Sequence, residues 1–91
     1  MKKKKLKKAA ALSYDHGSDT APLVVAKGQG KIAEKIIGIA NANNIPLHED
    51  RNLVQVLDAL DLNREIPSEL YRAVAEVLVF VYKLNREYGK M

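Results

Sequence analysis

The sequence predicts a small α/β domain: a three-stranded sheet that contains a βαβ unit, covered by three helices of which the last is long. Three observations favour this class: short apolar segments of strand length, a helix-period pattern that follows a pair of glycines, and a long apolar helical pattern near the C-terminus. The 91 residues are enough for one domain. We predict that this domain spans residues 9–88 and that residues 1–8 form a flexible basic arm.

The arm is defined by a run of lysines. It carries six of them, and without these six the nine remaining basic residues face eleven acidic ones, so the body is net −2. Such an arm attracts nucleic acid or anionic lipid in a salt-dependent way, or serves only as a solubilising segment. No aromatic residue interleaves with the lysines, so base stacking is not indicated. The arm lysines are Lys2, Lys3, Lys4, Lys5, Lys7 and Lys8.

Three segments have the pattern of strands. Residues 9–14 alternate in the period of a strand, and residues 23–26, which follow Pro22, are apolar on both faces. A strand that is apolar on both faces is typical of a parallel sheet that is covered on two sides. Residues 45–48 are the third predicted strand.

A helix is predicted between the second and third strands. Two glycines, Gly28 and Gly30, interrupt the strand pattern, and Asn43-Asn44 ends the helix because Asn tolerates the left-handed conformation. The strand–helix–strand order predicts a right-handed βαβ crossover. The apolar stripe of the helix comprises Ile32, Ile36, Ile39 and Ala40, widened by Ala33 and Ile37.

Two more helices are predicted in the second half. Asp50 has the side chain of an N-cap for the first of them, residues 61–65 form a connector, and the last helix begins near Pro67 and ends near residue 88. The buried stripe of the shorter helix is predicted to be Leu53, Val56, Leu57 and Leu60.

No motif in the sequence indicates catalysis. Gly28-Gln29-Gly30-Lys31 lies where phosphate loops lie, but it completes neither a dinucleotide fingerprint nor a Walker loop, so we interpret it as a turn. Without cysteine, and with only His16 and His48, a metal site is not expected. Glu76 is expected to face solvent. We therefore predict a binding module that is not an enzyme and has no cofactor.

Membrane and targeting segments are not expected either. The longest apolar stretch covers residues 73–82, which is short of the roughly 20 residues that a transmembrane helix needs. The lysines at the start are not followed by the apolar region of a signal peptide. We expect a cytoplasmic protein.

Four segments together resemble a known family. AAALSYD, APLVVAKGQGKIAEKI, NNIPLHED and IPSELYRAVAEVLVFVYKLNR, in this order, are similar to the cytoplasmic C-terminal domain of the flagellar type III export switch proteins, the FlhB/YscU family. The resemblance runs from about residue 9 to residue 86. In that family the domain follows a membrane domain, cleaves itself within an Asn-Pro-Thr-His motif, and switches export from rod and hook subunits to filament subunits.

The sequence departs from the family at the cleavage motif. Asn-Pro-Thr-His is absent, and Leu6, Lys7 and Lys8 stand in its place. The chain therefore resembles a free-standing copy of the post-cleavage fragment, which is not expected to cleave itself. The family's first cytoplasmic strand is also missing, and this predicts an open sheet edge that pairs with the membrane-bound remainder of a full-length switch protein.

The resemblance also implies a docking surface. In relatives, an Ala-Pro pair and small apolar positions on the last helix form a shallow patch for export substrates, and here these positions are Ala21, Pro22, Ala75 and Leu78. The alternative for Ala75 and Leu78 is that they belong to the core. The leading interpretation is a non-enzymatic protein that binds export-gate components or export substrates. The alternative is a small RNA- or ribosome-associated protein that uses the lysine arm, but the net −2 body disfavours nucleic acid as the partner.

Overall fold

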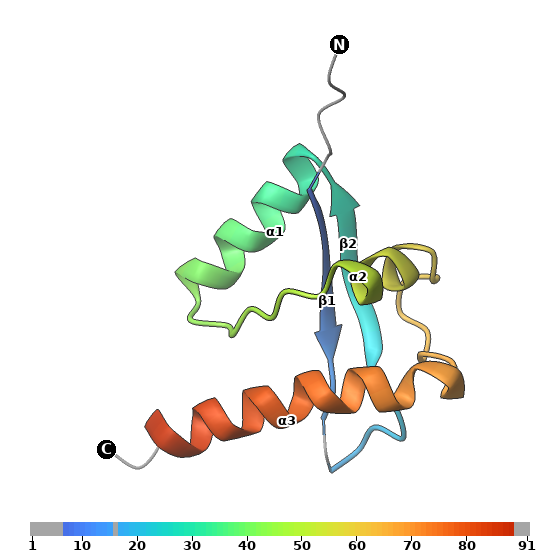
Figure 1. Ribbon diagram of the computed structural model, residues 1–91, viewed down its shortest axis with the longest axis vertical. Helices are drawn as coiled ribbons and strands as arrows, with labels where there is room; N and C mark the ends of the chain where they lie inside the picture. The colour runs from blue at the N-terminus through green and yellow to red at the C-terminus, as the bar shows by residue number, and fades with distance from the viewer. Residues whose placement is uncertain (1–6, 16, 89–91) are drawn as a thin grey trace.

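A hairpin and three helices make up the fold (Figure 1). The computed structural model describes residues 7–15 and 17–88, with side chains as far as Lys83; most of the predicted arm, residues 1–6, lies outside the described residues. The elements in order are β1 (Lys8–Ser13), β2 (Leu23–Gln29), α1 (Lys31–Ala42), α2 (Arg51–Asp58), the 3-10 turn η1 (Ser68–Leu70) and α3 (Tyr71–Tyr88). β1 thus begins inside the segment that was predicted as the arm.

β1 and β2 form an antiparallel pair. Lys8 lies opposite Gln29 and Ser13 opposite Leu23, and the register shifts between Ala11 and Leu12. This bulge leaves Val25 without a partner residue, and its side chain is 42% exposed. The parallel sheet that the apolar run predicted is wrong, because β1 and β2 are antiparallel. The expected βαβ unit is wrong too, because residues 45–48, which follow α1, form no strand.

The third predicted strand is also wrong, because the described sheet has only two strands and residues 45–48 form no ladder. A different segment occupies the second edge of β2. The Asn63 N–H donates to the carbonyl of Val24 at 2.8 Å, the Ile66 N–H donates to that of Pro22 at 3.0 Å, and Leu23 and Glu65 form an isolated bridge. Since β1 and the predicted connector fill both edges of β2, residues 45–48 have no place beside it.

The turn between β2 and α1 needs both of its glycines, as the sequence predicted. Gly30 has φ of 58° and ψ of −124°, a conformation that side chains disfavour. A Cβ on Gly28 would lie 2.2 Å from the Cγ2 of Ile32. The end of α1 is also confirmed, since Asn43 is its C-cap and Asn44 has φ of 56°.

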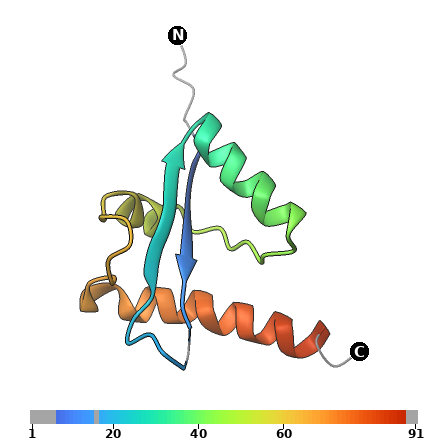
Figure 2. The same ribbon diagram turned by 180° about the vertical axis from the view of Figure 1, so that it is seen from behind.

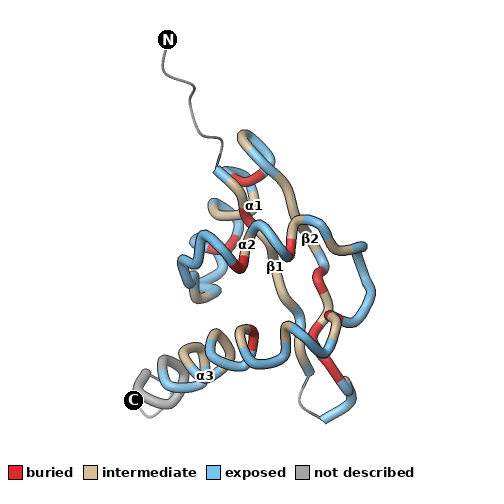
Figure 3. Tube along the Cα trace, turned by 45° about the vertical axis from the view of Figure 1, so that its right-hand side comes forward, coloured by how far each residue is buried: buried red, intermediate tan, exposed pale blue. Residues whose placement is uncertain are grey.

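The core lies between the hairpin and the two later helices. The strands pass in front of α2 and α3 in Figure 2 and behind them in Figure 1, so both helices lie on one side of the hairpin. The Oδ1 of Asp50 accepts the N–H of Leu53 at 2.9 Å, which confirms the predicted N-cap of α2. Buried positions on β2, α2 and α3 face one another (Figure 3), and the core cluster comprises Val24, Leu53, Leu57, Ile66 and Val74.

Two predicted apolar stripes differ from the structure. On α1 the buried residues are Ala33 and Ala40, whereas Ile32 and Ile39 are exposed. On α2, Val56 is 44% exposed. Small side chains are buried where α1 packs against the strands, Ile36 and Ile37 are half-buried, and Ile32 and Ile39 lie on the outside.

Candidate functional site

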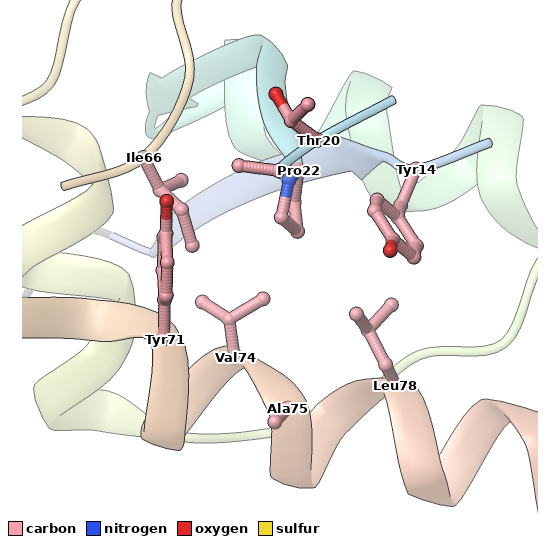
Figure 4. A pocket seen from close by; sticks show the side chains of 9 residues that line it. Tyr14, Thr20, Pro22, Ile66, Tyr71, Val74, Ala75 and Leu78 are labelled. Carbon is pink, nitrogen blue, oxygen red and sulfur yellow. The ribbon is translucent and has the colours of Figure 1, made fainter. Parts of the chain in front are cut away.

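A shallow groove lies where β1 ends and β2 begins, against the side of α3 (Figure 4). Its volume is about 190 Å³. Segments far apart in the sequence meet here because the loop between the strands and the start of α3 lie at the same end of the hairpin (Figure 1). The lining residues are Tyr14, Thr20, Ala21, Pro22, Ile66, Tyr71, Val74, Ala75 and Leu78.

The strand side of the groove is held by backbone pairing. Ala21 and Pro22 come directly before β2 and are buried, and the Pro22 carbonyl accepts the N–H of Ile66 at 3.0 Å. The hydroxyl of Thr20 donates to the carboxylate of Glu65 on the same segment. These bonds fix the Ala-Pro pair against the connector, so this wall of the groove is built by the fold and not by a free loop.

The helix side of the groove follows one stripe of α3. Tyr71, Ala75 and Leu78 are spaced by four and three residues, so their side chains share one face of the helix. Figure 4 shows the short side chain of Ala75 between the larger ones of Tyr71 and Leu78. Ala75 is exposed and Leu78 is half-buried, whereas Val74, one position away, is buried and belongs to the core.

The four residues that the resemblance assigned to a patch, Ala21, Pro22, Ala75 and Leu78, all line this groove. The exposure of Ala75 speaks against a core role for it. Sequence reasoning did not assign Tyr14, Thr20, Ile66 or Tyr71 to the site. For Tyr71 the signal was present, since it occupies the same helical stripe as Ala75 and Leu78. For Tyr14 and Ile66 only the fold brings them to the groove.

The chemistry of the lining is apolar with three hydroxyl groups. Tyr14, Thr20 and Tyr71 supply the hydroxyls, and no carboxylate, imidazole or ammonium group is among the lining residues. Such a surface takes up aliphatic or aromatic side chains and offers a few hydrogen bonds. Over residues 7–15 and 17–88, no three His, Asp or Glu residues are grouped to hold a metal ion.

The other residues singled out from the sequence lie elsewhere. Lys7 and Lys8 are at the opposite end of the hairpin, where the Lys7 carbonyl accepts the N–H of Gly30 at 2.8 Å. Lys2, Lys3, Lys4 and Lys5 lie outside the described residues. Glu76 is exposed, as expected, and His48 contacts Phe80 of α3 with ring centroids 5.4 Å apart.

Comparison with protein families accounts for most of the chain. The sequence model of the family described as "FlhB HrpN YscU SpaS Family" matches residues 7–81. The chain belongs to this family. The match covers both strands, α1, α2 and the groove-lining part of α3, so the groove lies within the residues that match the family.

Curated relatives include a short protein and long ones. The chain is 44% identical to YlqH of Bacillus subtilis over 80 residues, covering 88% of this chain and 86% of that protein. It is 42% identical to the flagellar biosynthetic protein FlhB of Aquifex aeolicus and 43% identical to that of Escherichia coli, covering 89% and 86% of this chain. The match spans only 24% and 21% of those two FlhB proteins.

Solved structures of FlhB/YscU-type domains share the fold. The cytoplasmic domain of FlhB from Shewanella putrefaciens superimposes with a TM-score of 0.81 at 36% identity, covering 91% of this chain and 64% of that one. The PscU C-terminal domain gives a TM-score of 0.77 at 30% identity, covering 80% and 94%. None of the helices in the described part of this chain has the length and apolar character to span a membrane.

Proposed function

We propose that this protein is a non-enzymatic interaction protein of the flagellar type III export apparatus, and that it binds apolar segments of export substrates or export-gate components in the groove. The observation that carries the proposal is the convergence of Ala21 and Pro22 with Ala75 and Leu78 on one open groove. These positions are more than fifty residues apart in the sequence, and the resemblance assigns all of them to a docking patch. Family membership supports a role in the export apparatus.

The size of the groove supports a peptide segment as the occupant. Its volume of about 190 Å³ is smaller than the roughly 300–1,000 Å³ of small-molecule sites. Full burial of one Leu or Phe side chain contributes about 1.5–3 kcal/mol, and a shallow groove that buries it in part contributes less. Binding through so small a contact is weak and reversible, which suits a surface that export substrates visit in turn.

The proposal assigns no catalytic step to this chain. No carboxylate, imidazole or ammonium group lines the groove, and the sequence has no Asn-Pro-Thr-His. We propose that the chain acts as the counterpart of the cleaved C-terminal fragment. The Shewanella putrefaciens relative is described as a cytoplasmic domain, and we propose the same location here.

A charge placed in the groove tests this role. We expect purified rod or hook subunits from the same organism to bind the chain, and we expect Ala75→Glu to weaken that binding tenfold or more, because a carboxylate would be desolvated beside Leu78. Val79→Glu is the matched control: Val79 is 51% exposed on α3 but does not line the groove. Isothermal titration calorimetry measures both. Equal affinities for Ala75→Glu and the unmodified chain would exclude the groove as the docking site.

The outer edge of β1 supports a second partner. In the described sheet β1 pairs only with β2, so its other edge offers unpaired backbone groups. We propose that a strand from the membrane-bound remainder of a full-length switch protein adds to this edge. On mixing the two proteins, the alternate amides of β1 that point away from β2 should gain hydrogen-exchange protection. Unchanged exchange throughout β1 would contradict the pairing.

RNA association, the competing interpretation, predicts a different result in pull-downs from the protein's own cells. Export-apparatus proteins that remain after nuclease treatment support the proposed role. Ribosomal proteins that disappear on nuclease treatment or at raised salt would instead assign the function to the lysine arm.

A further inference from the structure

Helix α1 exposes two of its four isoleucines. Ile32 is 59% exposed and Ile39 is 53% exposed, although the helix packs against both strands through the buried Ala33 and Ala40. Ile32 and Ile39 are seven residues apart, two turns along the helix, so they lie on the same side. The half-buried Ile36 lies between them. An aliphatic stripe is therefore left open beside the packed face.

Lysines border this aliphatic stripe. At about 100° per residue, Lys31, Lys35, Ile39 and Ile32 together cover a sector of about 100° on the helix. Both lysines are exposed. Glu34, the acidic residue of α1, lies about 160° from Ile32, so the open face combines positive charge with aliphatic surface and carries no carboxylate of its own helix.

The start of the chain adds charge at the same place. The Gly30 N–H donates to the Lys7 carbonyl at 2.8 Å, which places Lys7 beside the first turn of α1. Lys8 follows in β1, and the sequence puts Lys2 to Lys5 within five residues of Lys7, a reach of about 18 Å at most. Lys7, Lys8 and Lys31 thus lie near the N-terminal end of α1, and the register of the hairpin puts this end opposite the groove (Figure 1).

We propose that this basic–aliphatic face of α1, defined by Lys31, Ile32, Lys35 and Ile39, docks the protein on an anionic membrane surface. Helices that lie at a membrane surface combine these features. Their lysines attract anionic lipid headgroups, and their aliphatic side chains insert between the headgroups and the acyl chains. The positive charge alone would attract either a nucleic acid or an anionic lipid surface. The exposed isoleucines favour lipid, because a nucleic acid provides no apolar environment in which they could be buried. This face also has no aromatic residue that could stack on bases. The inference does not depend on the groove, which stays open at the other end of the hairpin.

The contributions of the lysines and of the isoleucines to membrane binding can be measured separately. A lysine near an anionic surface contributes about fivefold in partitioning, so Lys31→Gln with Lys35→Gln should lower the partition coefficient about 25-fold. Ile32→Ser with Ile39→Ser should lower it at least tenfold, because two aliphatic side chains no longer leave water. All four side chains are exposed, so we expect these variants to remain folded.

Vesicle sedimentation of the full chain tests the proposal. The probes are vesicles of pure phosphatidylcholine and of phosphatidylcholine with about one third phosphatidylglycerol, at about 0.1 M salt, where surface charges act over about 10 Å. We expect binding to the anionic vesicles only. The matched controls are Val79→Ser and Arg51→Gln, which remove an exposed aliphatic side chain and an exposed charge outside this face, and each should change partitioning less than twofold.

Three results would overturn the inference. The first is equal or no binding to the two vesicle types. The second is binding that depends on the lysines but not on Ile32 and Ile39, which would reduce it to attraction by the arm. The third is tighter binding to polyglutamate or to duplex DNA than to anionic vesicles, with the same sensitivity to the variants, which would assign the face to an acidic protein or to nucleic acid.

Discussion

Helices α1 and α3 bury opposite kinds of side chain. In α3 the large Val74 is 1% exposed, and the small Ala75 beside it faces solvent and leaves room for the groove. In α1 the small Ala33 and Ala40 are buried against the strands, and the large Ile32 and Ile39 are exposed. On α3, apolar residues therefore form part of the core and one wall of the groove. On α1, apolar residues form a close contact with the strands and leave an aliphatic face exposed.

The difference follows from the size of the residues that each helix packs against. The strand residues that face one another near α1 are alanines and glycines, with Ala9 opposite Gly28 and Ala11 opposite Ala26. Small residues on both sides let α1 approach closely, and no room is left for isoleucine. α3 packs over the larger Val24 and Ile66, so a valine fills the space between them. Stability should therefore depend on the α3 end far more than on the aliphatic side chains of α1.

Truncation of one isoleucine in each region is the strongest test of this contrast. Ile66 is 2% exposed and Ile32 is 59% exposed. Ile66→Ala should lower the free energy of unfolding by about 2–5 kcal/mol, through lost burial and the cavity left behind. Ile32→Ala should change it by no more than about 0.5 kcal/mol. Denaturant titration of both variants measures the two values, and equal losses would show that α1 contributes to the core as the helical spacing alone implied.

Sequence reasoning succeeded where the determinant is local. The two-glycine turn, the Asp50 cap, the Asn43-Asn44 end of α1 and the long last helix all depend on residues close in the chain, and the structure has each of them. The groove is a different case. Local rules do not bring its two walls together, and only the family resemblance assigned Ala21, Pro22, Ala75 and Leu78 to one surface.

Long-range features caused the errors. Strand direction and partner choice depend on which edges are free, and residues 63–66 occupy an edge of β2, which no local pattern indicated. The buried side of α1 was assigned by hydrophobicity, which ranks isoleucine above alanine. The small residues on the facing strands reverse that order. A helical period locates an apolar stripe, but its neighbours decide which part of the stripe is buried.

A methyl group added at Gly28 tests the close approach of α1 directly. Its Cβ would meet the Cγ2 of Ile32 at 2.2 Å, so Gly28→Ala should lower the free energy of unfolding by about 1–3 kcal/mol through overpacking. Gly38→Ala is the matched control, because a Cβ there would have no atom within 4 Å. That variant should raise stability by about 0.4–1 kcal/mol, as helical alanine restricts the unfolded chain. Thermal unfolding of both shows whether the two signs differ; two stabilising substitutions would refute the tight contact.

The smallest expected effect concerns α2, which supplies Leu53 and Leu57 to the core on the α3 side of the hairpin. The Asp50 carboxylate accepts the N–H of Leu53 at 2.9 Å, at the first turn of that helix. Asp50→Ala should lower the free energy of unfolding by about 1 kcal/mol, whereas Asp50→Asn keeps an acceptor at the same place and should have little effect. Glu49→Ala controls for the lost charge, since Glu49 is exposed and makes no cap. Hydrogen exchange of the first-turn amides locates the change: if Asp50→Ala leaves the Leu53 amide as protected as before, the first turn of α2 is held by the core and the cap contributes nothing to it.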